Sequence, residues 1–440
     1  MSLRFFAVAL LAWGCATAYS QDIAGQWQGT LKAPTPSPPG PGLRLVLQVA
    51  KTDSGKWKAE VYSIDQTTDA ILSSELSFEG RVLKFNVDAV RGTYEGKLSE
   101  DGRSIAGTWN QGRPLPLDFK RATPETTWVI DPAKHTVQFI NVDKDGGNDV
   151  KLEVLDWGGS GQPVVFLTGL GNNAHVFDKL APKFTDRYHV YGITRRGFGK
   201  SSVPAGGYGA DRLGDDVLVV IDSLKLNKPV LVGHSIAGEE MSSIGSRHPE
   251  KVAGMVYLEA GYQYAFYNNA HPNPRMDLVD IRQKAERLIL QGADRSAVIT
   301  QLLESDLPRL TKDLEQMRKE VVGLSAAQLA AQAAAGAQAN SPTRAIVFGG
   351  QTYTKIPVPI LAIFAVPHDL GPQAGTDPAA RASAEARDAE TVGVQADDFE
   401  KGVPTARVVR IAHANHYVFE SNEADVIREM NAFLPSLKRD

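Results

Sequence analysis

Polar and apolar residues alternate one by one along the first part of the chain, up to about residue 122. The alternation is clear over residues 43–49 and 83–87, and turn-forming residues such as those at 53–55 interrupt it. A period of two predicts antiparallel strands with one buried face. A recurring Gly-x-aromatic-x-Gly unit, first seen at residues 25–29, supplies glycines where a small curved sheet needs bends. We expect an antiparallel β-barrel or sandwich over residues 21–122 that serves as a structural or docking domain, with ligand binding as the alternative.

The pattern changes after Thr123 and Pro124, where continuous apolar runs of strand length alternate with stretches of helical spacing. Over residues 213–224, for example, apolar side chains recur at the spacing of one helix face. Apolar strands that alternate with helices are typical of a mostly parallel sheet covered on both sides. We therefore expect an α/β fold with a doubly wound, mostly parallel sheet over residues 125–440. The expected strands are residues 137–142, 150–155, 164–168, 189–194, 230–233, 252–258, 358–365 and 406–412.

About a hundred residues interrupt this alternation between the expected strand ending at Leu258 and the one beginning at Val358. A simple connection between two elements needs far fewer residues. We expect a helical lid at about residues 262–345, and a helix bundle on a distant part of the surface is the alternative. The segments with helical spacing or composition are residues 276–291, 296–304, 311–322 and the alanine-rich 326–335.

The first twenty residues differ from both of these regions. Arg4 precedes an apolar run at residues 5–13, and small residues follow the run. This arrangement is typical of a cleavable signal peptide over residues 1–20, and the run is too short to span a membrane. The only cysteine, Cys15, lies inside it and would be removed with it; lipidation of Cys15 is the alternative. We expect a secreted or periplasmic protein without disulfides.

Composition narrows the classes of partner. The chain has 47 Lys and Arg residues, 51 Asp and Glu residues and a formal net charge of −4. A charge this small, without a basic run, argues against nucleic acid as a partner. A single cysteine excludes a metal site built on cysteine thiolates. We expect a small-molecule substrate, no metal, no cofactor and no membrane span, and the oligomeric state stays open.

The segment from Val230 to Gly238 carries the most specific chemical signal. A short apolar run brings Ser235 into a turn flanked by Gly233 and Ala237, and helix-compatible sequence follows. Such a strand–turn–helix is the pattern of a nucleophile elbow, in which small neighbours let the strand and the helix pass closely. Ala237 stands where the usual Gly-x-Ser-x-Gly pattern has its second glycine. Ser235 is the expected nucleophile.

A serine nucleophile needs an imidazole that accepts its proton and a carboxylate that orients the imidazole. His416 follows the last expected strand and is our choice for the base, ahead of His413. Asp369, just beyond the expected strand 358–365, is our choice for the acid, and Glu259 at the end of the preceding strand is the alternative. His368 and Asp369 together could indicate a metal site, but no third ligand lies at a suitable spacing in the sequence.

The oxyanion of a tetrahedral intermediate needs two hydrogen-bond donors. The backbone N–H of Ile236, at the start of the helix after the serine, supplies one of them. Leu170, between two glycines in a loop after an apolar strand, supplies the second. This loop is a poor phosphate site, because it lacks the lysine of a P-loop and a complete Gly-x-Gly-x-x-Gly.

The order of these motifs resembles the α/β-hydrolase superfamily over residues 125–440. The order is Gly169-Leu170-Gly171, then Arg195-Arg196-Gly197-Phe198-Gly199, then Gly233-His234-Ser235, Asp369 and Asn415-His416. The resemblance implies a lidded fold shared by esterases, lipases, peroxidases and peptidases. Thr168 departs from the histidine that many relatives carry before the oxyanion glycine. A serine at position 235, where epoxide hydrolases and dehalogenases use aspartate, argues against their chemistry.

The sequence predicts a secreted serine hydrolase that cleaves carboxylic esters through an acyl-enzyme on Ser235. The alternatives are a peptidase or amidase of the same fold and a non-catalytic protein that binds a ligand. The expected substrate-binding residues, His175 and Tyr262 with Phe177, Tyr264, Phe266 and Tyr267, are aromatic residues near the site motifs. A peptidase would need an acid that binds the substrate amine, and its weak candidates are Asp277, Asp280 and Glu286.

Overall fold

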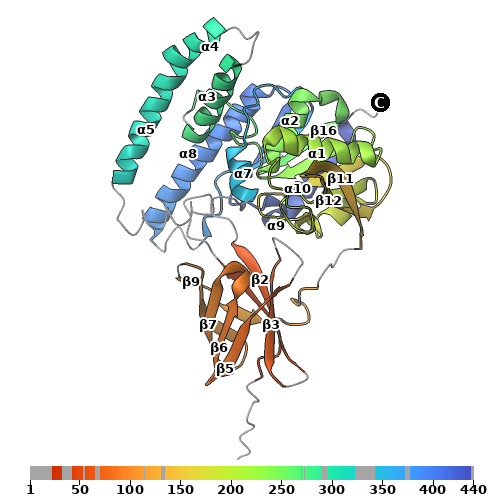
Figure 1. Ribbon diagram of the computed structural model, residues 1–440, viewed down its shortest axis with the longest axis vertical. Helices are drawn as coiled ribbons and strands as arrows, with labels where there is room; N and C mark the ends of the chain where they lie inside the picture. The colour runs from red at the N-terminus through yellow and green to blue at the C-terminus, as the bar shows by residue number, and fades with distance from the viewer. Residues whose placement is uncertain are drawn as a thin grey trace, which may run out of the picture.

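A computed structural model describes most of the chain in two parts, an N-terminal sheet (red to orange in Figure 1) and a larger part that contains the remaining strands and the helices. The predicted signal peptide with Cys15 and the alanine-rich segment 326–335 lie outside the described residues. In the part that the structure covers, no helix combines the length and the apolar character that crossing a membrane requires. The described residues are 22–31, 42–52, 55–64, 70–112, 114–129, 134–268, 270–271, 273–289, 295–322, 342–371 and 377–437.

The N-terminal part is one curled antiparallel sheet, so its strands do not divide into the two sheets of a sandwich. Its strands run in the order β4-β3-β2-β1-β10-β8-β7-β6-β5, and β9 pairs with β8. The strands are β1 Gly25–Leu31, β2 Leu43–Lys51, β3 Trp57–Ser63, β4 Ile71–Leu72, β5 Glu75–Glu79, β6 Val82–Val87, β7 Gly92–Leu98, β8 Ser104–Asn110, β9 Pro114–Pro116 and β10 Phe119–Arg121.

The alternating pattern explains how this sheet closes over its core. In β7 every second residue is buried, and the inward aromatic rings need glycine opposite them. A Cβ atom on Gly92 would lie 2.0 Å from the ring of Trp109, and one on Gly107 would lie 2.3 Å from the hydroxyl of Tyr94. The glycines of the repeated Gly-x-aromatic-x-Gly unit therefore make room for large rings in a small core.

The second part is an eight-stranded sheet in the order β11-β12-β14-β13-β15-β16-β17-β18, and all eight expected strands are present. Strand β12 pairs antiparallel with both of its neighbours, β11 and β14. All pairs from β14 to β18 are parallel. The expected α/β fold is confirmed. The strands are β11 Thr136–Asp145, β12 Asn148–Gly158, β13 Pro163–Leu167, β14 His189–Ile193, β15 Val230–His234, β16 Gly254–Leu258, β17 Ile360–Ala365 and β18 Ala406–Ile411.

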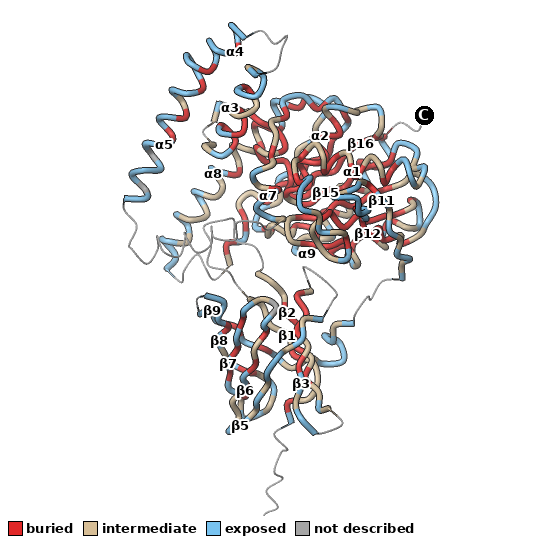
Figure 2. The backbone as a smooth tube through the Cα atoms, viewed as in Figure 1, coloured by how far each residue is buried: buried red, intermediate tan, exposed pale blue. Residues whose placement is uncertain are grey.

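Helices cover both faces of this sheet. Helices α1 (Ala210–Ser223), α2 (Ala237–Arg247) and α8 (Pro378–Gly402) contribute to the apolar core on one face. Helix α10 (Glu423–Phe433) and the short turn η2 (Ala174–Phe177) contribute to the core on the other. Figure 2 shows the buried residues concentrated in and around this sheet. Parallel strands covered on two faces end together at one edge, where the loops that follow them meet.

The insertion between β16 and β17 is helical, and its two ends contact the rest of the fold. Ile346 of α7 joins an apolar cluster with Leu213 and Ile236, and Met276 of α3 packs against Tyr264. Helices α4 and α5 stand away from the sheet in Figure 1 and are largely exposed in Figure 2. The helices are α3 Pro274–Ile289, α4 Arg295–Gln301, η5 Leu302–Asp306, α5 Leu307–Val322 and α7 Pro342–Phe348.

Candidate active site

Ser235 lies in the sharp turn between β15 and α2. Its φ of 53° falls in the left-handed region, where a residue with a side chain is strained. The turn closes through two hydrogen bonds, from Ser235 N–H to the carbonyl of Leu258 (3.2 Å) and from Gly238 N–H to the carbonyl of Ser235 (2.9 Å). A Cβ atom on Gly238 would lie 2.0 Å from the carbonyl oxygen of Ala260. The tight approach that the usual motif assigns to its second glycine therefore falls one residue later here, which is why Ala237 is tolerated.

His416 meets this serine from the loop after β18. Its Nε2 lies 2.9 Å from Ser235 Oγ, a hydrogen-bond distance. The carbonyl of His416 is held by Nε2 of His234, at 2.9 Å. Burial, with the neighbouring His416, lowers the pKa of His234 to about 3, so this ring stays neutral and donates one N–H. His413 is exposed, and only its backbone N–H is engaged, by the carbonyl of Pro367 at 2.8 Å.

Glu259 is the carboxylate that faces His416. It directly follows β16 in a left-handed conformation, with φ 51°, and its Oε2 lies 3.2 Å from His416 Nδ1. Its other oxygen accepts the backbone N–H of Ala365 at 2.5 Å. Burial raises the pKa of Glu259, but the hydrogen bonds and charges of His368 and His416 outweigh it and lower the pKa to about 2. Glu259 is therefore an anion within hydrogen-bond reach of the histidine.

Asp369, our first choice for the acid, does not reach His416. Its side chain is 55% exposed, accepts the N–H of Gly371 at 2.9 Å and lies 3.7 Å from Arg381. The physical reason is the strand-like pairing of residues 367–369 with the histidine loop, where Asp369 N–H donates to the carbonyl of Ala414 at 2.8 Å. Extended chain points successive side chains to opposite sides, so His368 turns inward and Asp369 turns to solvent. The structure thus brings the alternative acid, Glu259, to His416 and leaves Asp369 at the surface.

His368 is the residue of this site that sequence reasoning missed. It is fully buried, with Nε2 2.8 Å from Glu259 Oε2 and Nδ1 3.1 Å from both carboxylate oxygens of Asp388. The hydroxyl of Tyr262 also donates to Glu259 Oε2. His368 and Asp369 are adjacent in sequence, and they differ in the direction of their side chains: His368 points to Glu259, whereas Asp369 points to solvent.

The two expected oxyanion donors belong to segments that the fold brings together. Leu170 and Ile236 pack in one apolar cluster with Tyr264 and Ile346, the latter from α7. Ile236 directly precedes α2, whose N-terminus carries the partial positive charge of its unsatisfied N–H groups. A Cβ atom on Gly169 would lie 2.6 Å from His234 Nδ1, so the loop of Leu170 approaches the elbow as closely as glycine permits.

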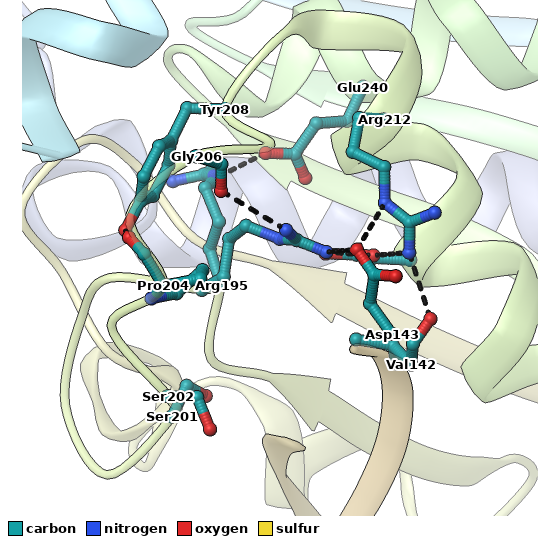
Figure 3. A network of polar contacts seen from close by, with 12 residues as sticks. Val142, Asp143, Arg195, Ser201, Ser202, Pro204, Gly206, Tyr208, Arg212 and Glu240 are labelled. Carbon is teal, nitrogen blue, oxygen red and sulfur yellow. Dashed lines mark hydrogen bonds and ion pairs between the residues drawn. The ribbon is translucent and has the colours of Figure 1, made fainter. Parts of the chain in front are cut away.

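Arg195 holds this loop against α2. Its guanidinium donates to the carbonyl of Thr168 at 2.6 Å and to that of Gly169 at 3.3 Å, and it pairs with Glu240. Figure 3 shows Arg195 reaching Glu240 within a larger network. Both side chains are only 4% exposed, so each charge has lost its water and is balanced by the other. The Arg-Arg-Gly-Phe-Gly motif thus explains the placement of the oxyanion loop.

The expected substrate-binding residues separate into three groups. His175 lines a cleft of about 740 Å³ between the two parts of the chain, and neither Ser235 nor His416 lines it. Phe177, Phe266 and Tyr262 are core residues, and the hydroxyl of Tyr262 donates its hydrogen bond to Glu259. Tyr264 is the one beside the elbow, because it packs in the same apolar cluster as Leu170 and Ile236.

The expected amine-binding acids are engaged inside the insertion. Asp277 accepts a hydrogen bond from Tyr267 at 2.5 Å and lies 3.3 Å from Arg309. Asp280 pairs with Lys284 at 2.6 Å, and Glu286 is exposed on the surface. One acid that the sequence analysis did not consider, Glu239 in the first turn of α2, is 1% exposed, and burial raises its pKa to about 8. A carboxyl group with this pKa is mostly neutral at pH 7.

Two clusters in the described residues offer three possible metal ligands each. Glu259, His368 and His416 have ligand atoms within 4.8 Å of one another, as do His135, His175 and Asp178. In the first cluster both rings bond Glu259 directly, and their other nitrogens face Ser235 and Asp388. In the second, His175 Nδ1 is 3.0 Å from Asp178 Oδ2, the distance of a direct hydrogen bond. The first cluster is therefore a continuous hydrogen-bonded network, and the second contains the direct His175–Asp178 pair.

Comparison with known proteins agrees with the fold. Residues 162–341 match the family model described as alpha/beta hydrolase fold. The chain is 31% identical over 101 residues to 2-(acetamidomethylene)succinate hydrolase of Mesorhizobium japonicum, covering 23% of this chain and 36% of that protein. It is 32% identical over 104 residues to 3-oxoadipate enol-lactonase 2 of Acinetobacter baylyi, covering 23% of this chain and 39% of that protein.

The chain therefore spans less than half the length of these two relatives. A crystal structure of bromoperoxidase from Bacillus anthracis aligns with a TM-score of 0.43 at 19% identity, over 68% of this chain and 100% of that one. The matched segment includes the oxyanion loop, the Arg-Arg-Gly-Phe-Gly motif and the elbow serine. The α/β part of the chain thus has the alpha/beta hydrolase fold, and its residues 162–341 match the model of that family.

Proposed function

We propose that this protein is a serine hydrolase that cleaves carboxylic esters through an acyl-enzyme on Ser235. The observation that carries the proposal is one continuous line of hydrogen bonds. Ser235 Oγ lies 2.9 Å from His416 Nε2, and His416 Nδ1 lies 3.2 Å from the buried Glu259 carboxylate. Nucleophile, base and orienting acid are the three groups that acyl transfer through serine requires.

In the proposed mechanism, Ser235 Oγ attacks the acyl carbon while His416 takes the hydroxyl proton. Glu259 holds the Nδ1–H of His416, which keeps Nε2 free to accept that proton. The backbone N–H groups of Leu170 and Ile236 receive the oxyanion, and the N-terminus of α2 adds its partial positive charge. His416 then gives the proton to the leaving alcohol, and a water molecule activated by His416 releases the acid.

The charges near the site favour an ester over a peptide that is recognised by its free amine. A peptidase that recognises a free amine needs an ionised acid facing the site, whereas Asp277 and Asp280 are paired within the insertion. Glu239 is near the elbow, but its raised pKa leaves it mostly neutral at pH 7 and so poorly suited to hold an ammonium group. The non-catalytic alternative is disfavoured because Ser235, His416 and the buried Glu259 anion lie together in the geometry that acyl transfer requires.

The proposal includes export, which rests on the apolar, small-residue pattern of residues 1–20. Expression of the full chain in a bacterium, followed by fractionation and mass spectrometry of the N-terminus, tests it. Export predicts a mature protein beginning near residue 19 or 21 outside the cytoplasm. A full-length chain in the cytoplasm would contradict it.

Turnover of short p-nitrophenyl esters and labelling by a fluorophosphonate test the catalytic assignment. Ser235→Ala is expected to reduce both to background, because the nucleophile is lost. Ser246→Ala is the matched control and should keep both, because Ser246 lies on α2, beyond the turn of Ser235, with its hydroxyl bonded to the carbonyl of Lys355. Labelling that persists in Ser235→Ala would overturn the assignment. Aminoacyl arylamides in the same assay separate peptidase from esterase activity.

A further inference from the structure

One buried histidine lies behind the candidate acid and has no role in the mechanism above. His368 is fully buried between the Glu259 and Asp388 carboxylates, with ring-to-carboxylate distances of 2.8 Å and 3.1 Å. Its backbone N–H also donates to Asp388 Oδ2 at 2.6 Å. Asp388 belongs to α8, so this helix, the end of β16 and the loop after β17 converge on one ring.

We propose that His368, held by Asp388, is a positioning residue that fixes the Glu259 carboxylate against His416 and balances its charge during acyl transfer. The inference deepens the proposed function and rests on it. It extends the hydrogen-bonded line from Ser235, His416 and Glu259 by two further residues. His368 acts through Glu259 and does not touch the reacting atoms.

The backbone makes this arrangement rigid. The segment of His368 forms a bridge with Ala414, two residues before His416, and His413 N–H donates to the carbonyl of Pro367 at 2.8 Å. The loop that carries the base and the loop that carries His368 are therefore joined directly. A displacement of His368 moves the acid and the base relative to one another.

The charges around His368 explain why a second histidine is present. The groups that face it are Glu259 from the end of β16, Asp388 from α8, Tyr262 from the insertion and, across Glu259, His416. Burial lowers the pKa of His368, but the hydrogen bonds and charges of Asp388 and Glu259 raise it to about 9. The remaining charged side chains beside this segment pair with one another at the surface; they are Asp369, Arg381 and Glu385.

At neutral pH, His368 is then a cation between two anions. The network of Glu259, Asp388, His368 and His416 has a net charge of −1 at rest and becomes neutral when His416 accepts the serine proton. A buried group of charges that reaches neutrality in the transition state stabilises that state. Without the His368 cation, the buried Glu259 and Asp388 anions would face one another with no opposite charge between them.

The test compares His368→Gln with the control His413→Gln, which replaces an exposed histidine on the facing loop. His368→Gln should lower kcat for a p-nitrophenyl ester by about 10- to 100-fold, the effect of losing a charged hydrogen bond, with little change in KM. It should also move the acid limb of the rate–pH profile to higher pH, because loss of a nearby cation favours protonation of His416. A purely structural role would lower the rate without moving this limb.

A second measurement does not depend on whether His368→Gln folds. Wild-type protein labelled with ¹⁵N-histidine should show a ring with both nitrogens protonated at about pH 8, where an ordinary histidine is neutral. Absence of such a ring, or an acid limb that stays in place in folded His368→Gln, would overturn the inference. Failure of the wild type to react with a fluorophosphonate would instead contradict the proposed function itself.

Discussion

Replacement of Glu259 by glutamine is the sharpest perturbation of this site, because it keeps the shape of the side chain and removes its charge. Glu259 Oε1 accepts the N–H of Ala365, and Oε2 accepts the rings of His416 and His368. An amide offers one acceptor oxygen and one NH₂ group, so it cannot accept at both positions. With its oxygen toward Ala365, the NH₂ group faces the two imidazole donors, and both charged hydrogen bonds are lost.

The magnitude follows from these two bonds. A hydrogen bond to a charged group contributes about 1.5–3 kcal/mol, so the loss of two costs about 3–6 kcal/mol. Expressed as a rate, this is a reduction of about 10²- to 10⁴-fold in kcat. The control is Asp369→Asn, whose exposed side chain contacts Gly371 and Arg381 among the described residues and which should change kcat by about twofold at most.

The assay is steady-state hydrolysis of a p-nitrophenyl ester, with thermal unfolding to confirm that each variant is folded. Active enzyme after Glu259→Gln, combined with a large loss after Asp369→Asn, would refute the geometric argument and restore Asp369 as the acid. Equally large losses of kcat in both variants would also contradict the argument. They would mean that Asp369 positions the site through contacts other than its hydrogen bonds.

Three further predictions concern the framework of the site. Gly238→Ala places a Cβ atom 2.0 Å from a carbonyl oxygen and should lower the free energy of unfolding by about 2–4 kcal/mol in urea titrations, whereas Gly206→Ala, with open space around it, should not. Arg195→Met leaves Glu240 buried without its cation and should cost about 3–5 kcal/mol, part of which the double change with Glu240→Gln recovers. The pKa of His368 is raised to about 9, so its contribution, about 3 kcal/mol, is complete below about pH 6.5 and is lost as the pH rises through 9. Urea unfolding from pH 6 to 10 should show this loss in the wild type, and a parallel curve for His368→Gln would contradict it.

The strands could be predicted from the sequence where the local pattern of apolar and polar residues alone decides them. The eight strands of the α/β sheet follow from apolar runs, and the antiparallel sheet follows from alternation, because burial of one or both faces is written residue by residue. The serine was predictable for the same reason, since an elbow needs small neighbours within a few residues. The choice of His416 over His413 came from its distance beyond the strand, and the structure places His416 against Ser235.

The acid was not predictable in this way. Asp369 and Glu259 both follow strands of the parallel sheet, and such strands end at one edge, so sequence position alone leaves both within reach. The direction of each side chain decides between them, and it depends on a pairing between residues 367–369 and the loop of His416 that are more than forty positions apart. The place of His175 could not be predicted for a related reason: it depends on how distant segments pack, and His175 lines a cleft that Ser235 does not line.

The sequence by itself determined the order of strands and helices, the elbow that presents Ser235 and the residue types available for chemistry. These depend on local burial and on backbone sterics, which neighbouring residues dictate. Only the tertiary structure decided that Glu259 faces His416, that His368 and Asp388 stand behind it, and that Tyr264 rather than His175 packs beside the elbow. Hydrogen bonds form between groups within about 3 Å, and contacts between distant segments at that range depend on how the whole chain packs.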